Sequence, residues 1–141
     1  MVVAGSNAKV HTFYLSTGTW SSVHLPLPAD IPDHFGRAVA IFGDTLFVGN
    51  MHDVVVDGVS LYTPSVTEYT VTGTTWLERG LLAVGDVTST TDMSLHSQDD
   101  LVAIGVPNTI VGGLSDCGRV DIIWHHPTYG YITFGAYESE E

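Results

Sequence analysis

The stretch FGRAVAIFGDTLFVGN, residues 35–50, predicts two β-strands joined by a tight turn. Apolar side chains fill most of 35–42 and 45–49, and Gly43 and Asp44 stand between these two runs. Glycine takes a positive φ without the steric cost that a side chain brings, which suits a two-residue turn. The second strand, TLFVG, is apolar almost throughout, as expected of a strand that other elements cover on both faces.

A degraded copy of this stretch, MSLHSQDDLVAIGVPN, occupies residues 93–108. Gly49 and Gly105 lie 56 positions apart. The same spacing separates the pairs Asp44 and Asp100, Leu46 and Val102, and Trp20 and Trp76. Residues 1–7 fit the same slot, with Gly5 in the place of Gly49 at a spacing of 44. Self-similarity at a regular spacing indicates a repeat architecture.

The spacing divides the chain into units at about 1–32, 33–90 and 91–137, followed by an acidic tail at 138–141. The first unit lacks an opening strand, so we expect three, four and four strands. The expected strands are 1–5, 9–15, 19–25, 35–42, 45–49, 58–62 with 66–71 as its extension or as an added ribbon, 75–82, 93–98, 101–105, 119–124 and 131–137. The expected connections are the proline-rich 26–32 and the stretches 50–57, 85–92 and 112–118.

A repeated four-stranded antiparallel unit is typical of a propeller blade, because stacking buries the faces that one unit leaves open. We therefore predict an all-β fold of four-stranded antiparallel β-propeller blades, about two and a half to three of them, in an incomplete ring. Closed propellers have roughly four to eight blades. Three arrangements remain open: a segment of a longer protein, a ring completed by copies or a companion chain, and an open sandwich. Exposed strand edges invite pairing, so we predict that the chain is not a free monomer.

Phe35 and Gly36, with the following AVAIFGDTLFVGN at 38–50, resemble the FG-GAP repeat of integrin alpha-subunit propellers and of many extracellular proteins. In that family a Phe-Gly pair opens the first strand, and a Gly-small-Pro step ends the second. Residues 48–50 and 104–107 occupy the place of the Gly-small-Pro step, whereas Thr91-Asp92 replaces Phe-Gly in the third unit. The resemblance covers nearly the whole chain. It implies blades that bind protein or glycan partners through loops, and it is the sole indication of an extracellular location.

The calcium loop of that family is absent, because Gly43-Asp44 is too short to supply the six or more oxygens that calcium needs. Two predicted loops do carry oxygen ligands, namely Asn50, Asp53 and Asp57 in one and Asn108 and Asp116 in the other. Such residues could hold calcium, but Asn and Asp also bond to their own backbone in ordinary turns. We favour the turn role and assign no metal site and no cofactor.

The net charge of −12, with four basic residues against sixteen acidic ones, excludes nucleic acid as an expected partner. An anionic membrane surface is disfavoured for the same reason, and no run is apolar and long enough to span a membrane. The acidity favours solubility, with a cation or a basic partner as the alternative. Residues 1–10 lack the features of a signal peptide, and the single Cys117 cannot form an internal disulfide.

No catalytic signature stands out, because neither a G-x-S-x-G elbow nor a phosphate loop is present. His11, His24, His34, His52 and His96 show no ligand spacing, and the adjacent His125 and His126 point to opposite faces of a strand. Aromatic residues could line a carbohydrate or peptide surface or pack between blades: Trp20, Trp76, Trp124, Tyr14, Tyr62 and Tyr129. Packing is favoured, because Trp20 and Trp76 recur at the repeat spacing.

These features predict a non-catalytic interaction or structural module that binds protein or glycan partners or builds a larger assembly from its own copies. The alternative is a component of a hydrolytic enzyme with carboxylates at the rim of the fold. A convergent acid pair in a deep pocket would favour the enzyme, and a flat acidic rim would favour the binding module. Fold alone does not decide between them.

Overall fold

The computed structural model describes residues 2–5, 9–28, 32–111, 114–126 and 128–138, and this part contains eleven strands and no helix. The strands are β1 (Val2–Gly5), β2 (Lys9–Ser16), β3 (Thr19–His24), β4 (His34–Phe42), β5 (Thr45–Val56), β6 (Val59–Thr72), β7 (Thr75–Val84), β8 (Ser94–Gln98), β9 (Leu101–Val111), β10 (Leu114–His126) and β11 (Gly130–Glu138). Within this part no helix is long and apolar enough to cross a membrane.

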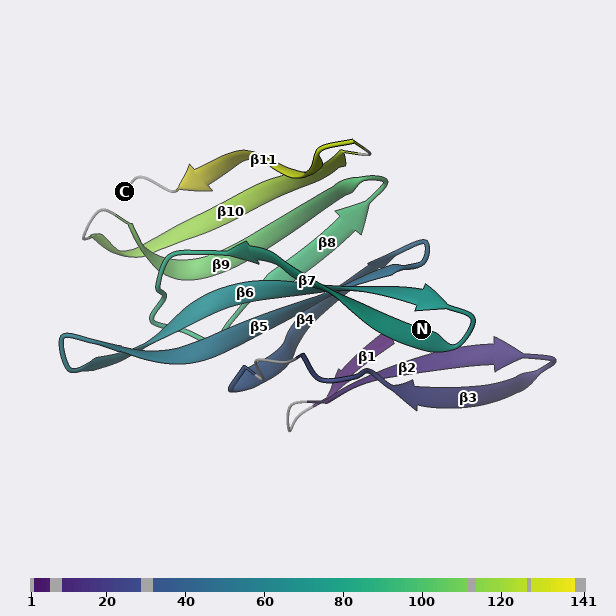
Figure 1. Ribbon diagram of the computed structural model, residues 1–141. Helices are drawn as coiled ribbons and strands as arrows, with labels where there is room; N and C mark the ends of the chain where they lie inside the picture. Colours follow the sequence, from purple (N-terminus) through teal and green to yellow (C-terminus); the bar gives the residue numbers. More distant parts are fainter. Residues whose placement is uncertain (1, 6–8, 29–31, 112–113, 127, 139–141) are drawn as a thin grey trace.

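The strands form three antiparallel sheets in which neighbours in sequence are neighbours in space. Sheet 1 holds β1–β3, sheet 2 holds β4–β7 and sheet 3 holds β8–β11. Figure 1 shows the sheets as successive layers, and they do not close into a ring. The predicted all-β class and the strand counts of three, four and four are confirmed.

The turn predicted at Gly43 is present, and this glycine has φ +55°. Asp99, 56 residues later, takes the same conformation with φ +52°. A side chain in this region is tolerated best when it is Asn or Asp, because the short polar group can bond locally. The repeat therefore keeps the turn geometry even where the glycine is lost.

The prediction of a loop at 50–57 is wrong. β5 continues to Val56, and β6 returns in register from Val59, with the turn at Asp57 and Gly58. Both turn residues have positive φ, +51° and +81°, as a type I′ hairpin turn requires. The β-branched run before the turn favours strand, so the two strands pair along their whole length.

The prediction of a loop at 112–118 is also wrong for most of its length. β10 begins at Leu114, which pairs with Val111, and it includes Cys117, whose backbone pairs with Thr109. Register shifts on either side of Cys117 absorb the irregularity of this Gly- and Ser-containing stretch. The side chains of Asp116 and Cys117 lie outside the described part of the structure.

A bulge at Gly36 and Arg37 follows Phe35 near the start of β4, because Phe35 pairs with Asn50 and Ala38 pairs with Gly49. Gly36 has φ +80°, which explains why a glycine stands here. Asn50 supports the bulge from β5, because its Oδ1 accepts a hydrogen bond from Gly36 N (3.4 Å) while its Nδ2 donates to Thr67 Oγ1 (2.9 Å). The Phe-Gly pair thus has a structural role in sheet 2.

Sheet 2 is covered on both faces by two hydrophobic clusters. Cluster 1, between sheets 1 and 2, contains Val10, Leu25, Phe35, Leu46, Val48, Tyr69 and Trp76. Cluster 2, between sheets 2 and 3, contains Phe47, Met51, Val66, Val102, Ile104, Val106 and Ile123. Successive side chains of β5 enter the two clusters alternately, as the two-residue period of a strand requires. The prediction that TLFVG is covered on both faces is therefore confirmed.

Thr88 ties the connection after β7 to the sheets on either side. Its backbone exchanges two hydrogen bonds with Tyr62, of 2.8 and 3.0 Å, and it forms a second antiparallel bridge with Thr109. Its side-chain hydroxyl is buried and donates to the carbonyl of Pro107. The polar stretch 85–92 is the predicted connection, and Thr88 within it also links β6 to β9.

Candidate functional site

Each sheet has a front face, directed at the preceding sheet, and a back face, directed at the following one. The back face of sheet 1 packs on the front face of sheet 2 through cluster 1, and the back face of sheet 2 packs on the front face of sheet 3 through cluster 2. Two faces have no sheet against them in the described part of the chain: the front of sheet 1 and the back of sheet 3.

The front of sheet 1 is built from alternate residues of β2 and β3. Val10 and Thr12 are buried toward sheet 2, so the residues between and after them point the other way. The outward set is Lys9, His11, Phe13, Leu15, Trp20, Ser22 and His24, and the pairs His11–His24, Phe13–Ser22 and Leu15–Trp20 place the two strands' residues on one face. Leu15 and Trp20 are 59% and 58% exposed, so this face presents large apolar side chains to solvent.

The repeat shows what these positions do when a sheet covers them. Phe13, Leu15 and Trp20 lie 56 residues before Tyr69, Val71 and Trp76, which contact sheet 1 in or beside cluster 1. Trp76 is only 5% exposed, whereas its counterpart Trp20 is 58% exposed. The predicted packing role is confirmed for Trp76, and Trp20 occupies the same place on a face without a neighbour.

The back of sheet 3 is the second uncovered apolar face. Leu101, Val120, Ile132 and Phe134 are exposed there, and the ring of Trp124 lies 5.7 Å from that of Phe134. The pair Trp124–Ile132 places both residues on this side, opposite Ile123 in cluster 2. The third tryptophan therefore belongs to a different surface from Trp20.

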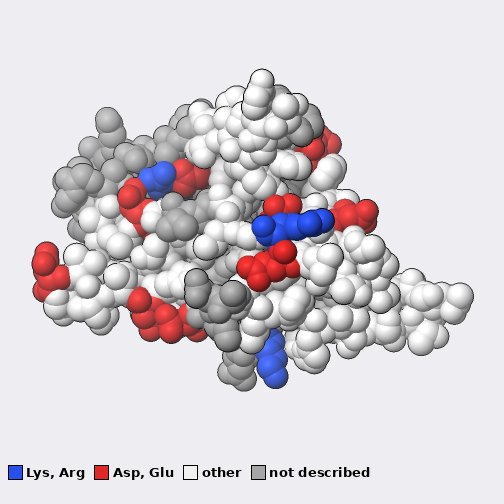
Figure 2. All heavy atoms as spheres, viewed as in Figure 1, with Lys and Arg blue, Asp and Glu red and all other residues white. Residues whose placement is uncertain are grey.

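Charge is depleted around the front of sheet 1. Of residues 1–29 only Lys9 is charged, and all sixteen acidic residues lie at Asp30 or beyond. Figure 2 shows the projecting end of β2 and β3 without a charged residue on the face in view, while acidic groups are spread over the rest. Depletion of charge with retained aromatic residues is characteristic of the core of protein interfaces.

The remaining predicted aromatic residues do not extend either face. Tyr14 packs against cluster 1, Tyr62 packs against cluster 2, and Tyr129 is 76% exposed in the turn before β11. The six aromatic residues therefore do not form one continuous binding surface. What the structure brings together instead is the strip of Phe13, Leu15 and Trp20.

The oxygen-bearing residues considered for calcium do not converge. Asn50 is fully buried in its contacts with Gly36 and Thr67, Asp53 pairs with His34 (3.0 Å), and Asp57 is at the tip of the hairpin. Asn108 lies in β9 with φ +56°. Among the described residues no group of three or more His, Cys, Asp or Glu could hold a metal ion.

The histidines take part in separate local contacts, with one exception. His52 Nε2 lies 3.1 Å from Ser65 Oγ, and the His125 ring lies 4.7 Å from that of Tyr131. The exception is His11 and His24, whose rings are 4.2 Å apart on the front of sheet 1. Sequence spacing missed this pair, although the Thr17-Gly18 turn could have indicated the register that brings it together.

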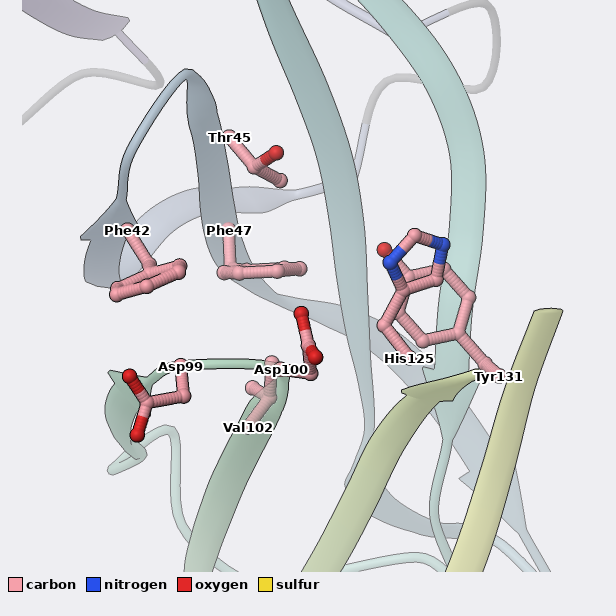
Figure 3. A pocket seen from close by; sticks show the side chains of 8 residues that line it. All are labelled: Phe42, Thr45, Phe47, Asp99, Asp100, Val102, His125 and Tyr131. Atoms are coloured by element: carbon pink, nitrogen blue, oxygen red, sulfur yellow. The ribbon is translucent and has the colours of Figure 1, made fainter. Parts of the chain in front are cut away.

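A small cavity of about 60 Å³ opens between the turns of sheets 2 and 3. Its lining residues are Phe42, Thr45, Phe47, Asp99, Asp100, Val102, His125 and Tyr131. Figure 3 shows the Asp100 carboxylate directed toward the cavity and the Asp99 carboxylate directed away from it. Burial, with the nearby Glu68 as a second cause, raises the pKa of Tyr131, which keeps the phenol neutral. Because the carboxylates of Asp99 and Asp100 point in different directions, they do not form the convergent acid pair that glycoside hydrolysis uses.

Comparison with protein-family models, curated proteins and solved structures finds no match.

Proposed function

We propose that this chain is a non-catalytic interaction and assembly module, a β-propeller-type stack whose uncovered faces bind protein. The contrast between Trp20 and Trp76 carries the proposal, because equivalent positions differ only in whether a sheet covers them. Burying an exposed tryptophan of this kind stabilises an interface by a few kcal/mol, as the apolar area of such a side chain implies. The resemblance of residues 35–50 to FG-GAP repeats supports the same assignment.

The chemistry of the front of sheet 1 favours protein over a small ligand. The strip is apolar and aromatic, and small-molecule sites are concave with convergent polar groups. The polar groups of this face, among the described residues of β2 and β3, are Lys9, Ser22 and the two imidazoles of His11 and His24. A glycan would require more hydrogen-bonding groups around the aromatic ring of Trp20. An apolar protein surface can pack on this face without such hydrogen-bonding groups.

The hydrolytic alternative has less support. The cavity beside Asp100 holds one inward-directed carboxylate, and its volume of about 60 Å³ accommodates a few waters rather than a sugar ring. On the face shown in Figure 2, the acidic residues are spread over the surface instead of gathering at one place.

The size of the native assembly tests the proposal. The full chain is tagged in the cells that make it, and its hydrodynamic mass is measured in the extract. We expect a complex larger than a single chain, and we expect Trp20→Asp to shift it to the mass of one chain. Leu77→Asp is the matched control, because Leu77 is 47% exposed on β7 but lies outside both uncovered faces. A wild-type chain that migrates alone in the extract overturns the proposed function.

A further inference from the structure

We propose that the front face of sheet 1 in one copy packs on the back face of sheet 3 in a second copy. This inference rests on the proposed function and names the partner of the same face. The two internal interfaces of the chain are both of one kind, a back face against the front face of the next sheet. The two uncovered faces are one front and one back, so they are the two halves of a third such interface.

The residues on the two faces support this pairing. The front of sheet 1 offers Phe13, Leu15 and Trp20, the counterparts of side chains that already bury against a back face. The back of sheet 3 offers Val120 and Phe134, which are 40% and 64% exposed. The back of sheet 3 has no charged side chain among the described residues of its strands, and the front of sheet 1 has one, Lys9 at the start of β2, so docking desolvates no Asp or Glu.

The paired register of β8 extends this argument to the inner part of the back face. Ser94, His96 and Gln98 pair with Gly105, Ala103 and Leu101, and these six residues face away from sheet 2. They are small, apolar or uncharged, as a surface that receives aromatic side chains requires. A second copy is therefore a chemically suitable occupant of the front of sheet 1.

The contact is heterologous, because the surface used on one copy differs from the surface used on the other. Heterologous contacts give rings when the rotation closes. Two copies contribute six sheets, within the range of roughly four to eight found in closed propellers, whereas three copies would contribute nine. We therefore assign two copies related by a two-fold axis, with two identical head-to-tail contacts.

The experiment uses the purified full chain and two single substitutions at exposed positions. Trp20→Asp disables the front face and Phe134→Asp disables the back face, and circular dichroism and thermal unfolding establish that each variant is folded. By sedimentation, the wild type is expected to be a dimer at micromolar concentration and each variant alone a monomer. Leu77→Asp, on neither face, is expected to remain dimeric.

An equimolar mixture of Trp20→Asp and Phe134→Asp distinguishes the head-to-tail contact from any other. Each mixed pair retains one intact back face and one intact front face, so a dimer is expected to reappear. It keeps one contact instead of two, so the mixture is examined at ~200 μM to offset the lost avidity. A mixture that stays monomeric overturns the proposal, as does self-association of either variant alone or a ladder of larger wild-type species.

The two proposals fail in different ways. A purified wild type that is monomeric at ~200 μM, combined with a Trp20-dependent complex in the cell extract, overturns the second copy and leaves the interaction module intact with another protein as its partner. A wild type that is monomeric in both settings overturns both proposals.

Discussion

The indole of Trp76 donates a hydrogen bond from Nε1 to Oγ1 of Thr12, 3.0 Å away, across the boundary between sheets 1 and 2. Both residues are buried, at 5% and 2% exposure. Thr12 in turn lies in hydrogen-bonding distance of the carbonyl of Val23 on its own sheet. The bond therefore joins two residues that are 64 positions apart and belong to different units, and it places a directional contact inside an otherwise apolar cluster.

Replacing this indole tests whether Trp76 stabilises the boundary between sheets 1 and 2. Trp76→Phe is expected to lower the free energy of unfolding by about 2–3 kcal/mol, because it leaves a small cavity and removes the donor to Thr12. Trp20→Phe, at the repeat-equivalent exposed position, is expected to change it by less than about 0.5 kcal/mol. Urea unfolding of dilute chain measures both. Equal losses in the two variants would contradict the assignment of Trp76 to the interface.

A side chain at position 49 is expected to destabilise the boundary between sheets 2 and 3. A Cβ there would overlap Sδ of Met93 and lie 3.3 Å from Cδ1 of Leu95, both on the sheet 3 side of the boundary. Gly49→Ala should therefore lower the free energy of unfolding by about 1–3 kcal/mol through overpacking.

A double-mutant cycle identifies the cause. Once Met93→Ala has removed the overlapping sulfur, Gly49→Ala should cost at least about 1 kcal/mol less than it does in the wild type. Strictly additive effects would mean that the glycine is required for a reason other than its approach to Met93.

Asn50 is expected to be structural rather than a calcium ligand. Asn50→Ala removes the acceptor of Gly36 N and the donor to Thr67, so it should lower the free energy of unfolding by about 2 kcal/mol. Millimolar calcium should leave the melting temperature of the wild type unchanged. A calcium-dependent rise that Asn50→Ala abolishes would restore the metal hypothesis for this hairpin.

Much of the fold was predictable, because its signals are local. The turn at Gly43 follows from the conformational freedom of glycine, and the spacing of 56 residues between Gly49 and Gly105 follows from repeated packing. The continuation of β5 beyond residue 49 was not predicted, because Asn50, His52 and Asp53 are polar residues that also occur in loops. The Asp57-Gly58 step was the available signal for a hairpin, and it carries more weight than the polarity before it.

The candidate site was less predictable, because exposure depends on what lies next to a sheet. Trp20 and Trp76 share a repeat position, and no local feature states that one is covered and the other is not. The depletion of charge across residues 1–29 was visible in the sequence and would have singled out this face. The His11–His24 pair required the register of β2 and β3, which a two-residue turn determines only once both strand ends are known.

A glycine at position 99 is expected to stabilise the turn between β8 and β9. Asp99 has φ +52°, where a side chain costs about 1 kcal/mol relative to glycine, so Asp99→Gly should raise the free energy of unfolding by up to about 1 kcal/mol. The reciprocal change Gly43→Ala, at φ +55°, should lower it by about 1 kcal/mol. As a control, Gln98→Gly in the adjacent strand should lower stability by about 0.5–1 kcal/mol. Stabilisation by Gln98→Gly would indicate a general effect of glycine.

The buried phenol of Tyr69 is expected to lower the free energy of unfolding of the protein in alkaline solution. Burial, with Glu78 as a second cause, raises the pKa of Tyr69, and its hydroxyl donates to the carbonyl of Pro26 at 2.9 Å. Below about pH 10, the value for an unfolded tyrosine, both states carry the phenolic proton and the contribution of Tyr69 is fully present. Above that pH the unfolded chain releases the proton and the folded chain retains it, so stability falls by about 1.4 kcal/mol per pH unit.

Tyr69→Phe should be less stable than the wild type at neutral pH but should lose less stability in alkali. At neutral pH it should lower the free energy of unfolding by about 1–2 kcal/mol, because the carbonyl of Pro26 loses its donor. Between pH 10 and 11 it should decline less steeply than the wild type by about 1 kcal/mol per pH unit, because up to one fewer proton is released on unfolding. Urea unfolding across this range measures both effects. A variant that keeps the full wild-type slope would show that the alkaline loss arises elsewhere, and that the burial of this phenol in cluster 1 does not control it.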